Sequence, residues 1–201
     1  LLATRAGLEM PRHLGFEAPR NGVTKQRLQE VLNWAEGQFH DCLIHHPEAA
    51  AAREYLRGRG FQPETVSRFR LGYHPQDWNW LINRSQGKYS IEQLVEARLI
   101  GERQSGNGHY DYFVDRLMFP IRDVQGQTVA FGGRILPGSS RPDAAKYWNS
   151  PESSLFAKSR LLYGMEMARD GFKQTDTAVV VEGYTDCILA HQAGLNHFVG
   201  T

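Results

Sequence analysis

The chain has little cysteine and no long run of apolar residues. Only Cys42 and Cys187 occur among its 201 residues, so a disulfide framework is not expected and a reducing cytoplasm is the simplest location. No apolar stretch approaches the ~20 residues that span a bilayer, and residues 1–12 lack the apolar segment of a secretory signal. Lysine and arginine (23) nearly balance aspartate and glutamate (22). Bulk charge therefore confers no affinity for nucleic acid, and any such affinity must come from local basic patches.

The two ends of the chain suggest a piece of a longer protein. It starts on Leu1 without a methionine, and it stops at Thr201, directly after a strand-like segment where an α/β unit would continue. Residues 1–23 are punctuated by proline and glycine and are expected to form a linker. We expect two structural units after it, at residues 24–170 and 171–201, the second of them truncated.

Helical periodicity dominates the first half of the chain. Thr24 is expected to cap a helix in which seven apolar residues recur at three- and four-residue spacing. These residues are Leu28, Val31, Leu32, Ala35, Phe39, Cys42 and Leu43. Shorter helices are predicted at residues 48–57, after Pro63, after Asp77 and after Ser90. Ser90 and Gln93 form a capping box, and Asp77 is expected to cap the segment that carries Trp78 and Leu81.

Strand patterns appear after residue 101. Residues 117–121 form a short apolar run, 123–126 have the composition of a hairpin turn, and 127–135 form the returning strand. Residues 161–168 return to helical spacing. The middle of the chain is therefore predicted to contain an antiparallel hairpin followed by a helix.

The last thirty residues predict a parallel unit. Residues 178–181 are a β-branched run of the kind found in strands buried on both faces. A turn, a helical stretch at 187–193 and a strand at 197–199 follow, which is the order of a parallel α/β domain. The expected fold class is an α+β N-terminal subdomain, with helices and a small antiparallel sheet, followed by the start of an α/β domain with parallel strands.

Two carboxylates follow the β-branched run. Glu182 ends the predicted strand, Gly183 permits a tight turn, and Asp186 lies in the first turn of the next helix. Open α/β sheets bind ligands at this edge, and paired carboxylates suit Mg²⁺, which prefers oxygen ligands. The alternative is that both residues stabilise the start of the helix, where acidic side chains are favoured anyway.

A basic and aromatic stretch covers residues 131–160. It carries five lysines and arginines against two acidic residues, with Gly132 and Gly133 before Arg134, and with Tyr147 and Trp148 among the basic residues. Cations interleaved with aromatic rings are used by proteins that bind single-stranded nucleic acid. The alternative is a solvated loop with scattered charge. A second basic cluster, at residues 53–70, is of the kind usually found on solvated helices.

One group of metal-ligand residues is expected not to bind metal. His40, Cys42, His45 and His46 are close in sequence, and Cys42 and His46 have helical i,i+4 spacing. However, Cys42 lies on the apolar stripe of its helix, and a structural zinc site needs four converging ligands. The expectation is an apolar-face cysteine beside surface histidines.

Seven segments together resemble the RNA polymerase domain of bacterial DnaG-type DNA primases. They occur in the order found in that family and cover most of the chain from Thr24 to Thr201. The segments are RGRGF at 57–61, FRLGY at 69–73, DRLMFPIRD at 115–123, FGGR at 131–134, KYWNSPE at 146–152, LYG at 162–164 and VVEGYTD at 180–186.

The resemblance implies synthesis of short RNA primers on single-stranded DNA from ribonucleoside triphosphates, with Mg²⁺ or Mn²⁺. Glu182 would be the catalytic and metal-binding acid that opens the family's Toprim fold, and Asp186 would complete its first motif. Six residues fall on the family's basic groove for template and nucleotide: Arg59, Arg134, Lys146, Tyr147, Asn149 and Lys158. The chemistry agrees, because phosphoryl transfer depends on metals and cations that position a polyanion.

The resemblance also implies parts that this sequence does not contain. A zinc-ribbon domain would precede Leu1, a metal-binding Asp-x-Asp pair would follow Thr201, and a domain that binds the replicative helicase would lie further on. We therefore expect zinc only in that preceding domain, and no primer synthesis by this chain alone. Trp148 stands where the family commonly has an aliphatic residue. Two alternatives remain: another Toprim enzyme, such as a topoisomerase or an OLD-type nuclease, or a non-catalytic nucleic-acid-binding protein of the replisome.

Overall fold

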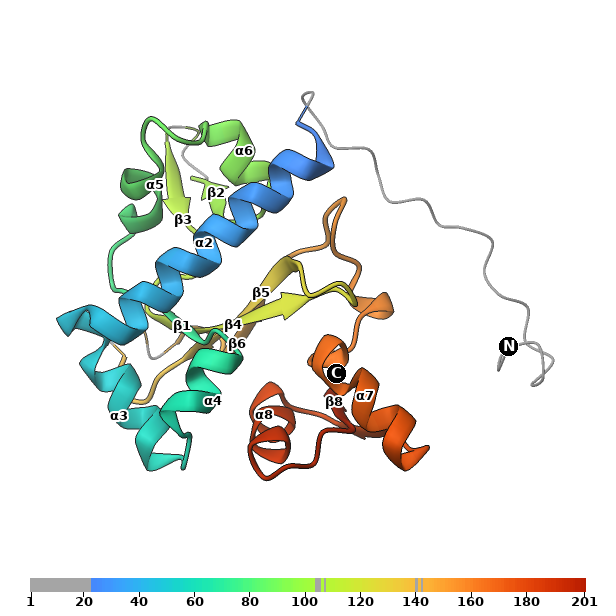
Figure 1. Ribbon diagram of the computed structural model, residues 1–201. Coiled ribbons are helices and arrows are strands. Elements are labelled where there is room, and N and C mark those ends of the chain that lie inside the picture. The colour runs from blue at the N-terminus through green and yellow to red at the C-terminus, as the bar shows by residue number, and fades with distance from the viewer. Residues whose placement is uncertain (1–22, 104–105, 107, 140, 142) are drawn as a thin grey trace.

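The computed structural model describes residues 23–103, 106, 108–139, 141 and 143–201 (Figure 1). Apart from Val23, the predicted linker lies outside these residues. The α- and 3₁₀-helices (α, η) are α2 (Lys25–His45), η2 (Pro47–Ala49), α3 (Ala50–Gly58), α4 (Pro63–Arg68), α5 (Trp80–Ser85), α6 (Ile91–Glu96), η3 (Lys158–Arg160), α7 (Met165–Thr175) and α8 (Tyr184–Gln192). The strands are β1 (Gly72–His74), β2 (Ile100–Glu102), β3 (His109–Asp111), β4 (Arg116–Arg122), β5 (Thr128–Ile135), β6 (Tyr147–Asn149), β7 (Val179–Val181) and β8 (Phe198–Gly200).

The long helix α2 has the start and the apolar face predicted for it. The Thr24 hydroxyl accepts a hydrogen bond from the Arg27 backbone N–H at 3.1 Å, and all seven residues of the predicted stripe are buried. The helix lies across the sheet (Figure 1), where the Phe39 ring meets the Phe131 ring edge-on at 5.2 Å. Among the described residues, no helix combines the length and the apolar character needed to cross a membrane.

The main sheet has the strand order β1-β4-β5-β6, and each neighbouring pair is antiparallel. The predicted hairpin is β4 and β5, and its turn is held by Asp123, which accepts hydrogen bonds from the N–H groups of Gln125 and Gln127. Strands β1 and β6 were not predicted, because three residues are too short to display a period of two. The small antiparallel sheet expected from the sequence is therefore confirmed, with two more strands than the hairpin.

Helix α5 differs from the prediction in its start and in its cap. It begins at Trp80, and Asp77 makes only a local turn by accepting from the Asn79 N–H at 2.9 Å. The carboxylate at the helix start comes instead from Asp111 at the end of β3, which accepts from the N–H groups of Leu81 and Ile82. The predicted cap was wrong because a residue thirty positions away takes the same role.

The C-terminal unit contains the predicted parallel pair. Strands β7 and β8 are parallel and joined by α8. Two details were wrong. Val180 is 56% exposed, because β7 has only β8 as a partner among the described residues, so this strand is not buried on both faces. The helix predicted at 161–168 begins only at Met165, because Tyr163 is drawn into an antiparallel bridge with Gly200.

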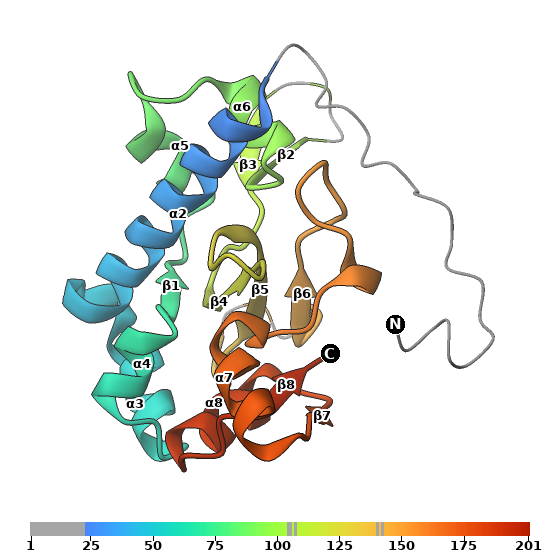
Figure 2. The same cartoon turned by 45° about the vertical axis from the view of Figure 1, so that its right-hand side comes forward.

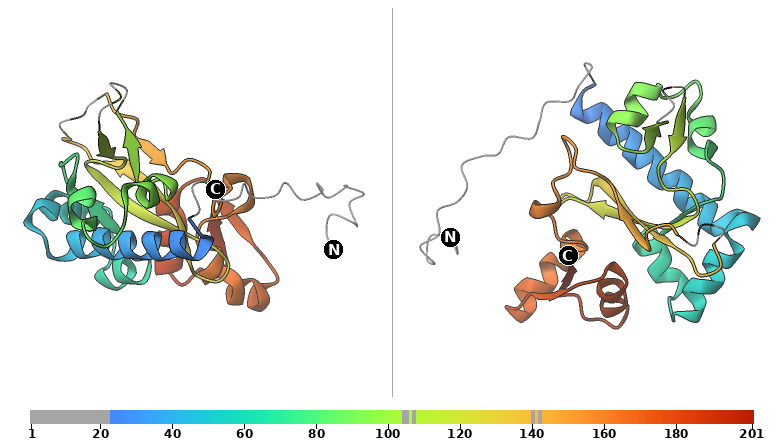
Figure 3. Two further views of the ribbon diagram at one scale, coloured as in Figure 1. Left: turned by 90° about the horizontal axis from the view of Figure 1, so that it is seen from above. Right: turned by 180° about the vertical axis from the view of Figure 1, so that it is seen from behind.

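The two units are joined by main-chain hydrogen bonds and by the side chain of Gln192. The N–H and carbonyl groups of Tyr163 and Gly200 bond reciprocally at 2.8 and 2.9 Å. The Gln192 amide donates to the Gly60 carbonyl and accepts from the Gln62 N–H. The C-terminal unit lies at the end of the molecule away from β2 and β3 (Figures 1 and 2), beside α4 (Figure 3). Helix α7 spans residue 170, and a domain boundary at that residue stays a prediction.

Candidate nucleic-acid interface and acidic strand end

Arg134 is a buried cation with no carboxylate partner among the described residues. It lies on β5 and is 8% exposed. Its Nη1 donates to the Tyr147 hydroxyl at 2.6 Å, and its guanidinium lies 5.1 and 5.2 Å from the ring centroids of Tyr55 and Tyr147. Its Nε has no hydrogen-bond partner among the described residues, and no ion pair forms there with a described carboxylate. Because burying an unpaired positive charge is costly, binding of an anion next to it would be stabilising.

The adjacent strand β6 carries Tyr147 and Asn149 of the predicted groove, and Lys146 directly precedes it. The register pairs Arg134 with Tyr147 and Gly132 with Asn149. Tyr147 is 47% exposed, and the Lys146 ammonium lies 6.0 Å from the centroid of its ring. A cation and an exposed aromatic face therefore lie next to each other, as stacking and phosphate binding require.

Arg59 and Lys158 come from two other segments. Arg59 is exposed at the end of α3, where its N–H bonds to the Tyr55 carbonyl, and Tyr55 is the residue on which Arg134 stacks. Lys158 is exposed in η3 and lines a cavity of about 490 Å³ together with Tyr184 and Thr201. The structure thus brings Arg134, Tyr147 and Asn149 together on β5 and β6. Arg59 directly follows α3, and Lys158 lies in η3, beside a cavity that Tyr184 and Thr201 of the C-terminal unit also line.

The acidic residues lie at the carboxyl end of β7. Glu182 and Asp186 are both exposed. A Cβ added to Gly183 would lie 2.7 Å from the Asp186 carboxylate oxygen, so the absence of a side chain at residue 183 lets this carboxylate lie against the turn. Mg²⁺ commonly keeps several waters and binds one or two carboxylates. Two exposed carboxylates at one strand end are a donor set that fits such an ion.

Tyr184 connects the acidic strand end with the basic strand. A Cβ added to Gly132 on β5 would lie 2.4 Å from a carbon of the Tyr184 ring and 3.0 Å from the Asn149 amide oxygen. Burial raises the pKa of the Tyr184 phenol, an effect that the Asn149 side chain partly offsets. Tyr184, which lies between Glu182 and Asp186 in the sequence, therefore touches β5, the strand that carries Arg134.

A second feature of this surface was missed from the sequence. A cavity of about 390 Å³ is lined by aromatic rings and two arginines: Trp78, Tyr110, Tyr112, Trp148, Arg116 and Arg141. The Arg141 guanidinium lies 4.9 Å from the centroid of the Trp78 ring. Arg116 is 3% exposed, and burial, followed by the Arg141 charge, lowers its pKa. No sequence motif reveals this pocket, because some seventy residues separate Trp78 from Trp148.

The fold is that of a primase catalytic domain. The crystal structure of the RNA polymerase domain of Mycobacterium tuberculosis primase DnaG aligns with a TM-score of 0.80 at 34% identity, over 88% of this chain and 56% of that chain. A structure described as the DnaG primase catalytic domain bound to ssDNA aligns with a TM-score of 0.77 at 34% identity, over 88% and 53% of the two chains. The predicted fold class is confirmed.

The sequence places the chain more narrowly. Residues 39–169 match the family described as the DNA primase catalytic core, N-terminal domain, and the chain belongs to this family. The DNA primase of Synechococcus elongatus is 44% identical over 197 residues, which cover 96% of this chain. The chain spans 27% of that relative's length. The family resemblance inferred from the seven segments is confirmed.

Proposed function

We propose that this chain is the template-binding part of a DNA primase, which synthesises short RNA primers on single-stranded DNA by metal-dependent nucleotidyl transfer from ribonucleoside triphosphates. The observation that carries the proposal is the contact between Tyr184 and Gly132. It sets the acidic turn of Glu182 and Asp186 beside the strand of Arg134. Phosphoryl transfer needs such a juxtaposition of acids and phosphate-binding cations.

The basic residues and the aromatic residues have different roles in this proposal. Lys146, Lys158 and Arg59 are exposed cations that bind phosphates of the template or the nucleotide, and Arg134 is a buried cation on β5. Tyr147 and the pocket around Trp78 and Trp148 offer faces on which bases stack. Asn149, on the same strand, would contribute hydrogen bonds to the template or the nucleotide. The structure of a relative's catalytic domain bound to ssDNA supports this choice of ligand.

The acidic residues have the metal role. Glu182 and Asp186 would hold Mg²⁺ or Mn²⁺, and the ion would neutralise charge on the triphosphate. The helicase partner, the RNA primer and a cytoplasmic location belong to the same proposal through the family resemblance, as does the presence of zinc in a preceding domain.

A pair of lysine substitutions tests the template-binding surface. Lys146 and Lys88 are both exposed, and each ammonium lies near the tyrosine that follows it, at 6.0 and 5.5 Å. Because Lys88 belongs to the segment before α6, away from β6, only Lys146→Ala should weaken binding of a single-stranded oligonucleotide. We expect a loss of about tenfold, and a decrease of about 0.7 in the magnitude of the log–log salt slope for one lost phosphate contact.

The measurement is fluorescence anisotropy of the chain with a labelled single strand at several salt concentrations. Lys88→Ala is expected to bind within about twofold of the unmodified chain, with the same slope. Equal behaviour of the two variants would remove Lys146 from the interface, and an absence of single-strand binding in the unmodified chain would overturn the proposed surface as a whole.

A further inference from the structure

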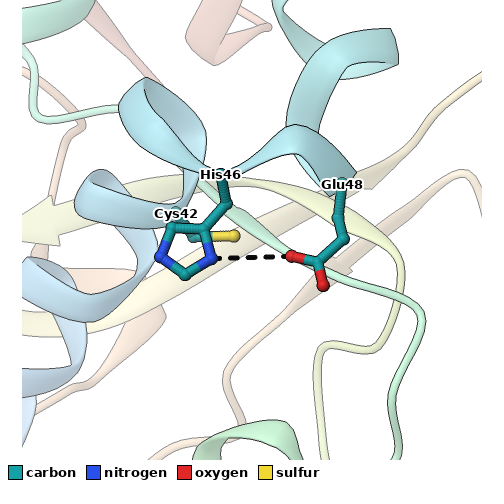
Figure 4. Close-up of side chains that lie close together, drawn as sticks. All are labelled: Cys42, His46 and Glu48. Carbon is teal, nitrogen blue, oxygen red and sulfur yellow. Dashed lines mark ion pairs between the residues drawn. The ribbon is translucent and has the colours of Figure 1, made fainter.

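Three side chains of different chemistry converge at the C-terminal end of α2. Cys42 lies on the last turns of this helix, His46 follows it directly, and Glu48 lies in η2. One ligand atom from each residue lies within 4.8 Å of the other two. Figure 4 shows the Cys42 sulfur beside the His46 ring, with the Glu48 carboxylate directed at the same edge of that ring. We propose that these three residues form a binding site for a divalent transition metal, with Zn²⁺ as the favoured ion, separate from the acidic strand end.

The distances between the donor atoms suit a tetrahedral ion. Zinc bonds of about 2.0 Å to nitrogen and oxygen and 2.3 Å to sulfur give ligand-to-ligand edges of roughly 3.3–3.5 Å. The His46 Nδ1 and the Glu48 Oε2 already lie 3.5 Å apart. The remaining edges, at most 4.8 Å long, require a movement of about 1 Å, which rotation of the Glu48 side chain and small shifts at His46 can supply.

The residues around His46 orient it as a ligand. Its other ring nitrogen, Nε2, lies 3.5 Å from the Asp41 carboxylate, an arrangement that fixes the ring and favours Nδ1 as the metal-binding atom. The backbone is held at the same point, because the His46 N–H bonds to the Cys42 carbonyl and Arg53 donates to the His46 carbonyl. The ligand therefore arrives on a fixed segment rather than on a loose loop.

The donor set selects the class of metal. A thiolate, an imidazole and a carboxylate are ligands of Zn²⁺, whereas Mg²⁺ takes oxygen ligands alone. Three protein ligands leave the fourth position to water. The free Cys42 thiol is protonated, because burial raises its pKa to about 12, with Glu48 and Asp41 adding to the rise and Arg84 and Arg53 opposing it. Metal binding must displace this proton, so affinity increases with pH.

Only two of the four residues that form a ligand cluster in the sequence, Cys42 and His46, belong to the proposed site. The His40 Nδ1 bonds to the Leu71 carbonyl at 2.7 Å, and His45 lies 3.9 Å from Asp41, so neither belongs to the site. Glu48 joins Cys42 and His46 instead. Glu48 reaches the other two ligands because the chain turns between α2 and η2. Helical spacing alone does not predict this turn.

Titration with Co²⁺, a spectroscopic substitute for Zn²⁺, tests the site in the chain as it exists. We expect a near-ultraviolet thiolate-to-cobalt charge-transfer band that Zn²⁺ abolishes by competition. The band should be absent in Cys42→Ser and retained in Cys187→Ser, a matched control because both thiols are fully buried and burial raises both pKa values to about 12. No band in the unmodified chain, or a band that Cys187→Ser abolishes, would overturn the proposal.

Substitutions at the surface of the cluster keep the test decisive if Cys42→Ser fails to fold. His46→Asn and Glu48→Gln should each weaken Co²⁺ binding by at least about tenfold, while His45→Asn, one residue away, should leave it unchanged. Circular dichroism checks that each variant is folded. Equal affinity in His46→Asn and His45→Asn would show that the ion binds elsewhere and would rule out this site.

Discussion

At the scale of single residues, Gly132 allows the Tyr184 ring to approach β5 more closely than any residue with a side chain would. An added Cβ would lie 2.4 Å from the Tyr184 ring, and this ring is held on its other side by stacking on Tyr163 at 4.5 Å. Gly132→Ala must therefore displace Tyr184. We expect a loss of about 1–3 kcal/mol in the free energy of unfolding, as for overpacked cores, and weaker single-strand binding by the folded variant. Denaturant unfolding and anisotropy measure the two effects.

A control for this prediction is Gly126→Ala in the β4–β5 turn. Gly126 has a positive φ of 81° but nothing within 4 Å of an added Cβ, so its cost is backbone strain of about 1 kcal/mol without an effect on binding. If Gly132→Ala bound the oligonucleotide as tightly as Gly126→Ala does, the link between the Tyr184 contact and the interface would be refuted.

The same scale shows what a sequence discloses about a site. Lys146, Tyr147 and Asn149 were singled out because they belong to one contiguous segment, and the structure places Tyr147 and Asn149 on β6, with Lys146 directly before it. The pocket around Trp78 and Arg116 was missed because its parts are distant in sequence. The separation of Arg134 from carboxylates also depends on packing, since Glu152 is near in sequence and instead accepts a hydrogen bond from the Lys158 N–H.

At the scale of elements, patterns encoded by neighbouring residues were predicted well, whereas the short strands β1 and β6 were not predicted. The stripe of α2 and the capping box at Ser90 both agree with the structure, since each is encoded by neighbouring residues. The cap of α5 comes from Asp111 on strand β3. The exposure of Val180 depends on which strands pair with β7. Local sequence carries neither kind of information.

Asp111 gives the prediction that belongs to this scale. It is fully buried, accepts from two N–H groups of α5, and lies 3.1 Å from the His74 Nε2. Asp111→Ala leaves these groups unpaired, so the free energy of unfolding should fall by about 3 kcal/mol. Asp77→Ala, at the cap inferred from the sequence, should cost no more than about 1 kcal/mol. Urea unfolding of both variants gives the comparison, and an equal loss would contradict the assignment of the cap.

At the scale of the whole molecule, two histidines make folding stability depend on pH. Burial lowers the pKa of His191 and of His40 from the ordinary value of 6.5. The unfolded chain then binds more protons than the folded one between the lowered values and 6.5, so stability is full above this window and declines as the pH falls through it. Burial raises the pKa of Glu166 from 4.5, and this contribution acts in the opposite direction, since it is lost as the pH rises from 4.5 through the raised value.

His191→Gln isolates one of these effects. His191 is buried at the junction of α8 and β8, and its Nε2 lies 2.8 Å from the Phe198 carbonyl. The glutamine amide can donate to the same carbonyl but does not titrate. We expect the decrease in stability between pH 7 and pH 5.5 to be smaller in the variant than in the unmodified chain. The measurement is chemical denaturation at each pH, and an unchanged or steeper decrease would contradict it.

The reciprocal bonds between Tyr163 and Gly200 have a further consequence. Because they join main-chain atoms, they attach β8 to the segment before α7 whichever side chain residue 163 carries. The contact between Tyr184 and Gly132, by contrast, depends on the side chains at both positions. A substitution at either position can therefore shift the acidic turn relative to β5 while β8 stays attached.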